Sequence, residues 1–235
     1  PPHRAQRALL HGIVTMHPSH HPPLDLLAAH TAGWLAEDQS LLVASHLELC
    51  PACRSEEAAL EKLGGELLEG AVDDAPPSAS LLDAVLRRLD EPVPPSAPPP
   101  ALPAFLADLP IPTVLHRYLA DVRRWSLLLP GIQEIALPVE GARLRCSLLR
   151  FKPGVLLPRH GHGGRELSLV LQGGFDDQSD AGDRVFLPGD LSCQDPEDDH
   201  EVRIHEEGCL VVFAREGRLL PRSLLASVGI FLGQL

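Results

Sequence analysis

Apolar residues recur at helical spacing through the first third of the chain. Four stretches show this pattern: residues 24–35, 39–50, 52–68 and 80–89. In the first, Leu24, Leu27 and Ala28 fall on one side of a helix, which predicts an amphipathic helix. The fourth stretch follows the turn-forming residues 73–78. We therefore expect an all-α module of three helices, with a fourth helix that stands apart from them.

The pattern changes after about residue 122 to short apolar runs separated by Gly, Pro and Asp. The runs are ARLRCSLLRF, LSLVLQGGF, VFLPGD and CLVVFA. Runs of this length and spacing are typical of an antiparallel barrel or sandwich. One short helix is expected before them, within residues 113–122.

A proline-rich segment separates the two patterns. Residues 92–103 hold seven prolines in twelve positions and cannot form a regular helix or an inner strand. We expect an extended linker there. The predicted fold class is multidomain, α plus β: a helical domain over residues 15–91, the linker over 92–103, and a β-barrel over 104–235.

The net charge of −12 restricts the partners that the chain can bind. Only two lysines are present, so a nucleic-acid backbone or an anionic membrane is not expected as a partner. Residues 20–91 carry four basic side chains against fourteen acidic ones, a net of −10, which favours a basic protein partner for the helical half. The residues given, which begin at Pro1, contain neither a membrane-spanning run nor a signal-peptide pattern, so a cytoplasmic location is expected.

A first group of metal-ligand residues lies in the helical half. Five cysteines make an odd number, which favours reduced thiols over a disulfide framework. His46, Cys50 and Cys53 form H-x3-C-x2-C, and helical spacing would place all three on one face. A tetrahedral zinc site needs a fourth ligand, for which the upstream candidates are His17, His20 and His21. A redox role for C-x2-C would require a strand-to-helix pattern that this half does not show.

A second group lies in the predicted barrel. Gly154, His160, His162, Glu166 and Gly173 form G-x5-H-x-H-x3-E-x6-G, and strand alternation places both histidines on one face. Two imidazoles and a carboxylate suit Zn, Mn, Fe or Ni. A later strand should supply one more histidine, either His200 or His205; His205 stands beside two glutamates and is expected at the surface.

Together the two motifs resemble those of the ChrR-type anti-sigma factors, which join a zinc-binding anti-sigma domain to a cupin domain. The resemblance runs from about His20 to the last strands of the barrel. It implies that His21 is the fourth zinc ligand, with His46, Cys50 and Cys53. It also implies that His160, His162, Glu166 and His200 bind a divalent metal in the barrel. One departure concerns the second cupin motif, which residues 188–190 do not reproduce.

The resemblance implies a regulator rather than an enzyme. The helical domain would bind and inhibit an ECF-type sigma factor. The cupin domain would sense or relay an oxidative-stress signal, such as singlet oxygen or peroxide, that releases the sigma factor. The alternative is a cupin metalloenzyme of the dioxygenase or isomerase type with an appended helical domain, although only 4% of the residues are aromatic and could stack on a substrate ring. A zinc-finger nucleic-acid binder is disfavoured by the acidic helical half.

Overall fold

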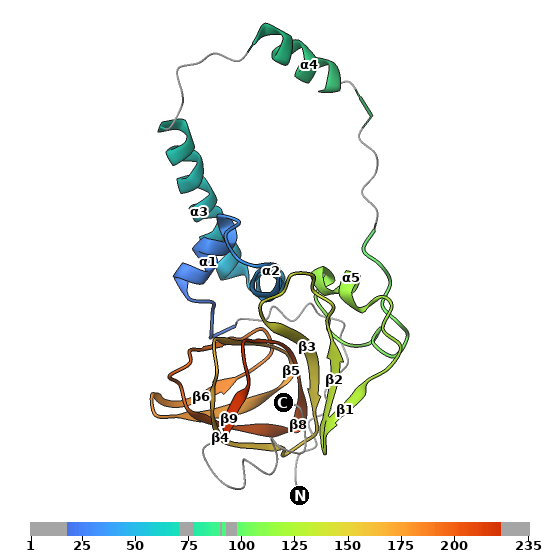
Figure 1. Cartoon of the computed structure of the whole chain (residues 1–235), viewed down its shortest axis with the longest axis vertical. Coiled ribbons are helices and arrows are strands. Elements are labelled where there is room, and N and C mark those ends of the chain that lie inside the picture. The colour runs from blue at the N-terminus through green and yellow to red at the C-terminus, as the bar shows by residue number, and fades with distance from the viewer. Residues whose placement is uncertain (1–17, 71–77, 90, 93–97, 222–235) are drawn as a thin grey trace, which may run out of the picture.

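The computed structural model describes residues 18–70, 78–89, 91–92 and 98–221. Helices α1 to α3 lie over one end of a β-barrel, and α4 stands apart from the barrel (Figure 1). The helices are α1 (Leu24–Thr31), α2 (Glu37–Leu49), α3 (Pro51–Gly70), α4 (Ala79–Leu89), the short 3₁₀ helix η1 (Thr113–Leu115) and α5 (His116–Leu119). The strands are β1 (Ser126–Leu129), β2 (Ile132–Ala136), β3 (Arg145–Phe151), β4 (Leu156–His162), β5 (Glu166–Ser179), β6 (Gly182–Phe186), β7 (Leu191–Gln194), β8 (His200–Arg215) and β9 (Leu219–Pro221).

Local residue chemistry sets the ends of the first three helices. Gly33, with a φ of +70°, closes α1 in the left-handed conformation that glycine adopts without strain. Cys50 is extended, with a φ of −114° and a ψ of 104°, because Pro51 follows it. Pro51 then begins α3, where its missing N–H costs nothing. The H-x3-C-x2-C motif therefore spans a corner between α2 and α3, and the prediction of a single helical face was wrong.

The barrel is built around two long strands that pair along their whole length. In the β5–β8 ladder Glu166 lies opposite Arg215, and Ser179 lies opposite His200. The outer edge of β8 pairs first with β4 and then with β3, while the outer edge of β5 pairs first with β7 and then with β6. All pairs are antiparallel. Since each long strand changes its outer partner partway along, β5 and β8 link the two halves of one nine-stranded sheet in the described residues, and this sheet curls into a barrel as predicted.

A register shift in the β5–β8 ladder explains the last glycine of the barrel motif. Gly173 has a φ of +72°, and a Cβ placed there would lie 1.9 Å from the carbonyl oxygen of Gly208 on β8. The ladder register shifts at this point. Any larger residue would force β5 and β8 apart at the place where the register of their pairing shifts.

One apolar core joins the helices to the barrel. The same buried cluster includes Leu27 of α1, Leu42 of α2, Leu115 of η1, Leu148 of β3 and Val212 of β8. A second buried cluster lies within the barrel and includes residues of β2, β5 and β8. Helix α2 therefore packs directly on the barrel.

Acidic side chains of α2 add polar contacts to this interface. Both backbone N–H groups of Arg143 and Leu144 donate to Asp38 Oδ2, at 2.6 and 2.7 Å. Glu48 accepts from the backbone N–H groups of Thr113 and Val114, at 2.8 and 2.9 Å, at the start of η1. Part of the acidic charge predicted to face a partner is thus used within the molecule.

Several expectations from the sequence match the structure. The fourth amphipathic stretch forms α4, and the helix expected within residues 113–122 is η1 followed by α5. The described part of the proline-rich segment, residues 98–103, contains neither helix nor strand. No helix in the described ranges combines the length and apolar character needed to cross a lipid bilayer.

Candidate metal centres

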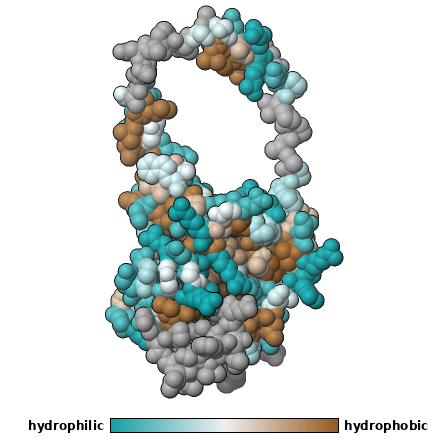
Figure 2. Space-filling view, viewed as in Figure 1, coloured by the Kyte–Doolittle hydropathy of each residue, from teal (hydrophilic) through white to brown (hydrophobic). Residues whose placement is uncertain are grey.

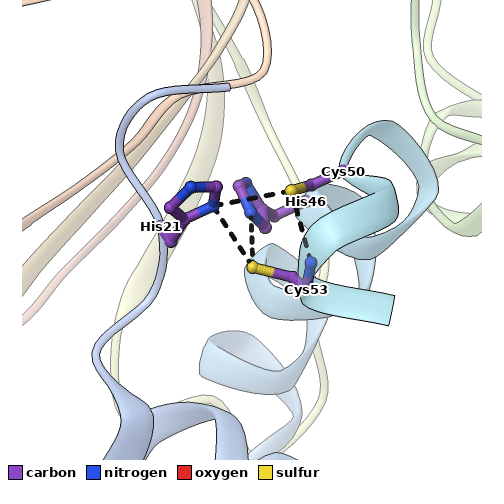
Figure 3. A group of neighbouring side chains, drawn as sticks. All are labelled: His21, His46, Cys50 and Cys53. Atoms are coloured by element: carbon purple, nitrogen blue, oxygen red, sulfur yellow. Dashed lines mark hydrogen bonds between the residues drawn. The ribbon is translucent and has the colours of Figure 1, made fainter. Parts of the chain in front are cut away.

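Four potential ligands converge at the corner between α2 and α3. His21, His46, Cys50 and Cys53 each offer an atom, and these atoms all lie within 4.8 Å of one another (Figure 3). His21 lies in the extended segment before α1, His46 lies in the last turn of α2, and Cys53 lies in the first turn of α3. We refer to these four residues as the helical cluster.

The spacing in the helical cluster suits a tetrahedral ion. Cys53 Sγ is 3.3 Å from both His46 Nε2 and His21 Nδ1, and Cys50 Sγ is 3.5 Å from His21 Nδ1. A tetrahedral zinc ion, with Zn–S of about 2.3 Å and Zn–N of about 2.0 Å, would separate its nitrogen and sulfur ligands by about 3.5 Å. Two imidazoles and two thiols at these distances fit zinc in donor chemistry and in size.

Burial keeps His46 and Cys53 of the helical cluster uncharged when no cation is bound. His46, Cys50 and Cys53 are buried, while His21 is exposed. Burial lowers the pKa of His46 to about 4, although a hydrogen bond to the Gly189 carbonyl opposes the shift. Burial and the neighbouring Cys50 raise the pKa of Cys53 to about 12. A bound cation would supply the positive charge that stabilises the thiolates.

Three histidines converge inside the barrel. His160 and His162 lie on β4 and His200 begins β8, and their ligand atoms lie within 4.8 Å of one another. Strand pairing places His160 opposite His200, and the Nε2 atoms of His162 and His200 are 3.1 Å apart. All three are at most 3% exposed. Burial, followed by the charge of His200, lowers the pKa of His160 to about 4, which leaves a neutral imidazole available as a ligand. We refer to these residues as the barrel triad.

Glu166 lies beside the barrel triad. Its Oε2 atom is 3.0 Å from Nδ1 of His162, but among the described residues neither buried atom has a hydrogen-bond partner of acceptable geometry. Burial alone would raise the pKa of the Glu166 carboxyl, but contact with His162 and the other two histidines holds that pKa below its usual value. Buried polar atoms of this kind normally have partners, and a cation among them would supply one.

Two residues that the sequence motifs did not indicate orient His200. Its Nδ1 donates to Asp177 Oδ1 at 2.9 Å, and Gln194 Nε2 donates to Asp177 Oδ2 at 2.8 Å. Asp177 is fully buried. Burial would raise its pKa, but the contacts with His200 and Arg184 hold that pKa below its usual value. Since Nδ1 of His200 carries the proton, Nε2 is the nitrogen left for a metal.

A backbone carbonyl orients His160 in the same way. Its Nδ1 donates to the carbonyl oxygen of Pro158 at 2.9 Å. His160, Glu166 and His200 line a cavity of about 40 Å³, whose other walls include Phe175, Val202 and further apolar side chains. A space of this size holds about three water molecules.

Two other candidate histidines, His20 and His205, lie outside both groups. His20 stacks against Phe186, with ring centroids 4.3 Å apart, and lies next to Asp190. His205 is partly exposed and its Nε2 is 3.0 Å from Asp176 Oδ1. His17 lies outside the described residues.

The chain is similar in sequence to known proteins. Residues 118–218 match the family model described as the ChrR cupin-like domain. The chain is 37% identical over 211 residues to the anti-sigma-E factor ChrR of Cereibacter sphaeroides, a match that covers 88% of this chain and 93% of that protein.

Similar solved structures point the same way. The crystal structure of Rhodobacter sphaeroides SigE in complex with the anti-sigma ChrR matches with a TM-score of 0.65 and 35% identity, over 85% of this chain and 100% of that chain. The structure of KdgF from a Halomonas species matches with a TM-score of 0.36 and 23% identity, over 43% of this chain and 89% of that chain. The second likeness is too low to bear on function.

Proposed function

The chain belongs to the ChrR family of anti-sigma factors, and from this premise we propose that it binds and inhibits an ECF-type sigma factor in the cytoplasm. The helical domain, residues 15–91, would make the contact, and the barrel, residues 104–235, would regulate it. The relative at 37% identity is named for this activity, and the solved structure at 35% identity is titled as a complex with SigE.

The observation that carries the proposal is the apolar surface that α3 and α4 leave uncovered. From Glu61 to Gly70 every residue of α3 is exposed, including Leu63, Leu67 and Leu68. A helix that extends without packing is only marginally stable in water by itself. Such a helix gains stability when a partner covers its apolar residues.

Helix α4 presents a more regular apolar stripe. Leu82, Val85, Leu86 and Leu89 recur at i, i+3, i+4 and i+7 and are all about half exposed or more. Figure 2 shows hydrophobic residues on the surfaces of α3 and α4, above the barrel. Acidic residues flank the α3 surface, so the occupant that fits best is a protein with an apolar groove and a basic rim, as proposed for the sigma factor.

We further propose zinc in the helical cluster, held by His21, His46, Cys50 and Cys53. The barrel triad, with Glu166, would hold one divalent metal, either zinc or Mn, Fe or Ni. The geometry of both groups supports metal binding but does not select the metal in the barrel. The zinc ion would stabilise the corner on which the direction of α3 depends.

A cupin metalloenzyme is the second candidate, and the cavity argues against it. Small-molecule sites usually measure on the order of 300–1,000 Å³. The space beside the barrel triad is about 40 Å³ and mainly apolar, too small for an organic substrate. We therefore propose that the barrel does not process such a substrate, and that it senses or relays an oxidative-stress signal, such as singlet oxygen or peroxide.

Capture of a sigma factor by the full chain tests the proposal. The wild-type chain is expected to retain an ECF-type sigma factor at equal stoichiometry from its source cell. The Cys53→Ser variant is expected to retain much less sigma factor and to bind one metal ion fewer per chain. Cys193→Ser is the matched control, because that thiol lies outside both clusters. Added oxidant should release the sigma factor from the wild-type chain but not from His160→Ala. Capture of no sigma factor by the wild-type chain would contradict the proposal.

A further inference from the structure

A turn of the barrel reaches into the helical cluster. The turn joins β6 to β7 over residues 187–190, where the second cupin motif departs from its usual form. Nδ1 of His46 donates to the carbonyl oxygen of Gly189 at 2.8 Å, and this contact is buried. Because a carbonyl only accepts, the proton of neutral His46 is on Nδ1, and Nε2 is the nitrogen that faces Cys53.

The same turn holds the segment that carries His21. The backbone N–H groups of Ser19 and His20 donate to Asp190 Oδ1, at 2.6 and 3.0 Å. In return, the N–H of Leu191 donates to the carbonyl oxygen of His20 at 3.1 Å. Asp190 is 1% exposed, so water competes little for these contacts. The barrel thus contacts the ring of His46 directly and holds the backbone next to His21.

The turn is also joined to the barrel triad by a short path. It continues into β7, whose Gln194 donates to Asp177, which in turn accepts from His200. On its other side the turn is hydrogen-bonded in both directions to Val170 of β5, at 2.8 and 3.0 Å, four residues beyond Glu166. A displacement of β7 or of the start of β5 would therefore move the carbonyl of Gly189 and the carboxylate of Asp190.

We propose that the β6–β7 turn positions two ligands of the helical cluster. Gly189 is the positioning residue for His46, and Asp190 is the positioning residue for His21. Strand β7 transmits rearrangement at the barrel triad to the helical cluster. The positioning role does not depend on the proposed function. Its use as the route by which the barrel releases a sigma factor rests on the proposed function.

Asp38 provides a matched control for the role of Asp190. Both are buried aspartates that accept backbone N–H donors across the same interface between helices and barrel. Asp38, however, accepts from the backbone of residues 143 and 144, which belong to neither group of ligands. A loss that is common to both variants therefore reports weaker docking, whereas a loss specific to Asp190 reports positioning of the ligands.

The test measures metal release from the helical cluster of the full chain, with no sigma factor present. Cobalt(II) replaces the native metal, and its absorption from sulfur-to-metal charge transfer reports only the thiolate-containing cluster. With excess chelator, Asp190→Asn is expected to release cobalt on the order of tenfold faster than wild type, the usual size of an effect from a residue that orients a metal ligand. Asp38→Asn, which weakens docking but accepts from no residue next to a ligand, is expected to release cobalt more slowly than Asp190→Asn. Equal rates for the two variants would overturn the positioning role.

Transmission through β7 is tested from the barrel side. Asp177→Asn alters the support of His200 and touches nothing in the helical cluster, yet it should also accelerate cobalt release from the thiolate site. Release at the wild-type rate would refute transmission.

Amide hydrogen exchange in the wild-type chain provides a test that does not depend on the folding of a variant. The Ser19 and His20 amides are expected to exchange as slowly as those of β7. Exchange at the rate of an unstructured peptide would refute their hydrogen bonds to Asp190. Each of these results is independent of whether the chain binds a sigma factor.

Discussion

At the scale of single residues, a hydrogen bond to one ring nitrogen determines which nitrogen of a histidine can bind a metal. His46 donates through Nδ1 to a carbonyl, and His200 donates through Nδ1 to a carboxylate. A carbonyl fixes the ring orientation, whereas the buried carboxylate of Asp177 also increases the electron density on the imidazole. The two groups of ligands are thus supported by acceptors of different strength.

Asp177→Asn should weaken metal binding in the barrel. The amide keeps the size of the side chain but loses the charge that holds the His200 proton, so the affinity of the barrel site is expected to fall on the order of 10- to 100-fold. Metal titration followed by native mass spectrometry measures this. The control is Asp180→Asn, which removes an exposed ion pair with Arg159 and should leave the affinity unchanged. An unchanged affinity for Asp177→Asn would show that His200 does not need its carboxylate partner.

The sequence predicted the residues of both groups because their identities are written in short motifs. His46, Cys50 and Cys53 lie within eight positions, and His160, His162 and Glu166 lie within seven. Asp177 and Gln194 could not be assigned in this way, because strand pairing between distant segments brings them to His200, and Asp190 could not because it reaches the His21 segment only across the folded interface. The one available signal was the pair of aspartates that directly follows Phe175 in a predicted strand.

At the scale of elements, the corner between α2 and α3 shows where helical periodicity fails as a guide. Spacing alone places His46, Cys50 and Cys53 on one helical face, but Pro51 forces Cys50 into extended backbone. The convergence of the three side chains survives because α3 turns back across the end of α2. Arg54 reinforces the corner by donating to the carbonyl oxygen of Leu47 at 2.7 Å.

A charge on the stripe of α4 should weaken sigma capture without unfolding the chain. Leu86 is 51% exposed, so Leu86→Glu removes little buried apolar area from the chain itself. In a complex it would bury an unpaired carboxylate, and we expect sigma capture to fall at least tenfold while the melting temperature stays the same. Asp83→Asn, on the same helix but outside the apolar stripe, is the control. Calorimetric titration and a thermal melt would separate the two effects, and undiminished capture would exclude α4 from the contact.

At the scale of the whole molecule, helices α1 to α3, η1 and α5 form one body with the barrel around a shared apolar core, and α4 stands outside it. The proline-rich segment predicted two domains, and the apolar positions of α2 predicted a helix with a packed face but did not indicate that this face packs on the barrel. Sequence patterns report the faces of elements, but they do not report that Glu48 caps the start of η1 or that Asp38 holds the β2–β3 connection. Such contacts depend on the three-dimensional packing of distant segments.

Asp38→Asn should destabilise this common body. The buried carboxylate accepts two backbone N–H groups across the interface, and the amide would leave at least one of them with a poorer partner. The free energy of unfolding is expected to fall by about 1–3 kcal/mol. Denaturant unfolding followed by circular dichroism measures the change, with the exposed Asp108→Asn as a control. A stability equal to that of wild type would mean that α2 does not depend on this contact.

The hydrogen bond from His46 to Gly189 has one more consequence, which follows from thermodynamic reciprocity. If docking of the helices on the barrel tightens metal binding by some factor, then the metal must tighten docking by the same factor. The free zinc concentration in the cell would then act as an effector of the interface, in competition with any signal that opens it. Starvation for zinc and stress at the barrel would be additive inputs, because each shifts the same equilibrium between docked and undocked helices.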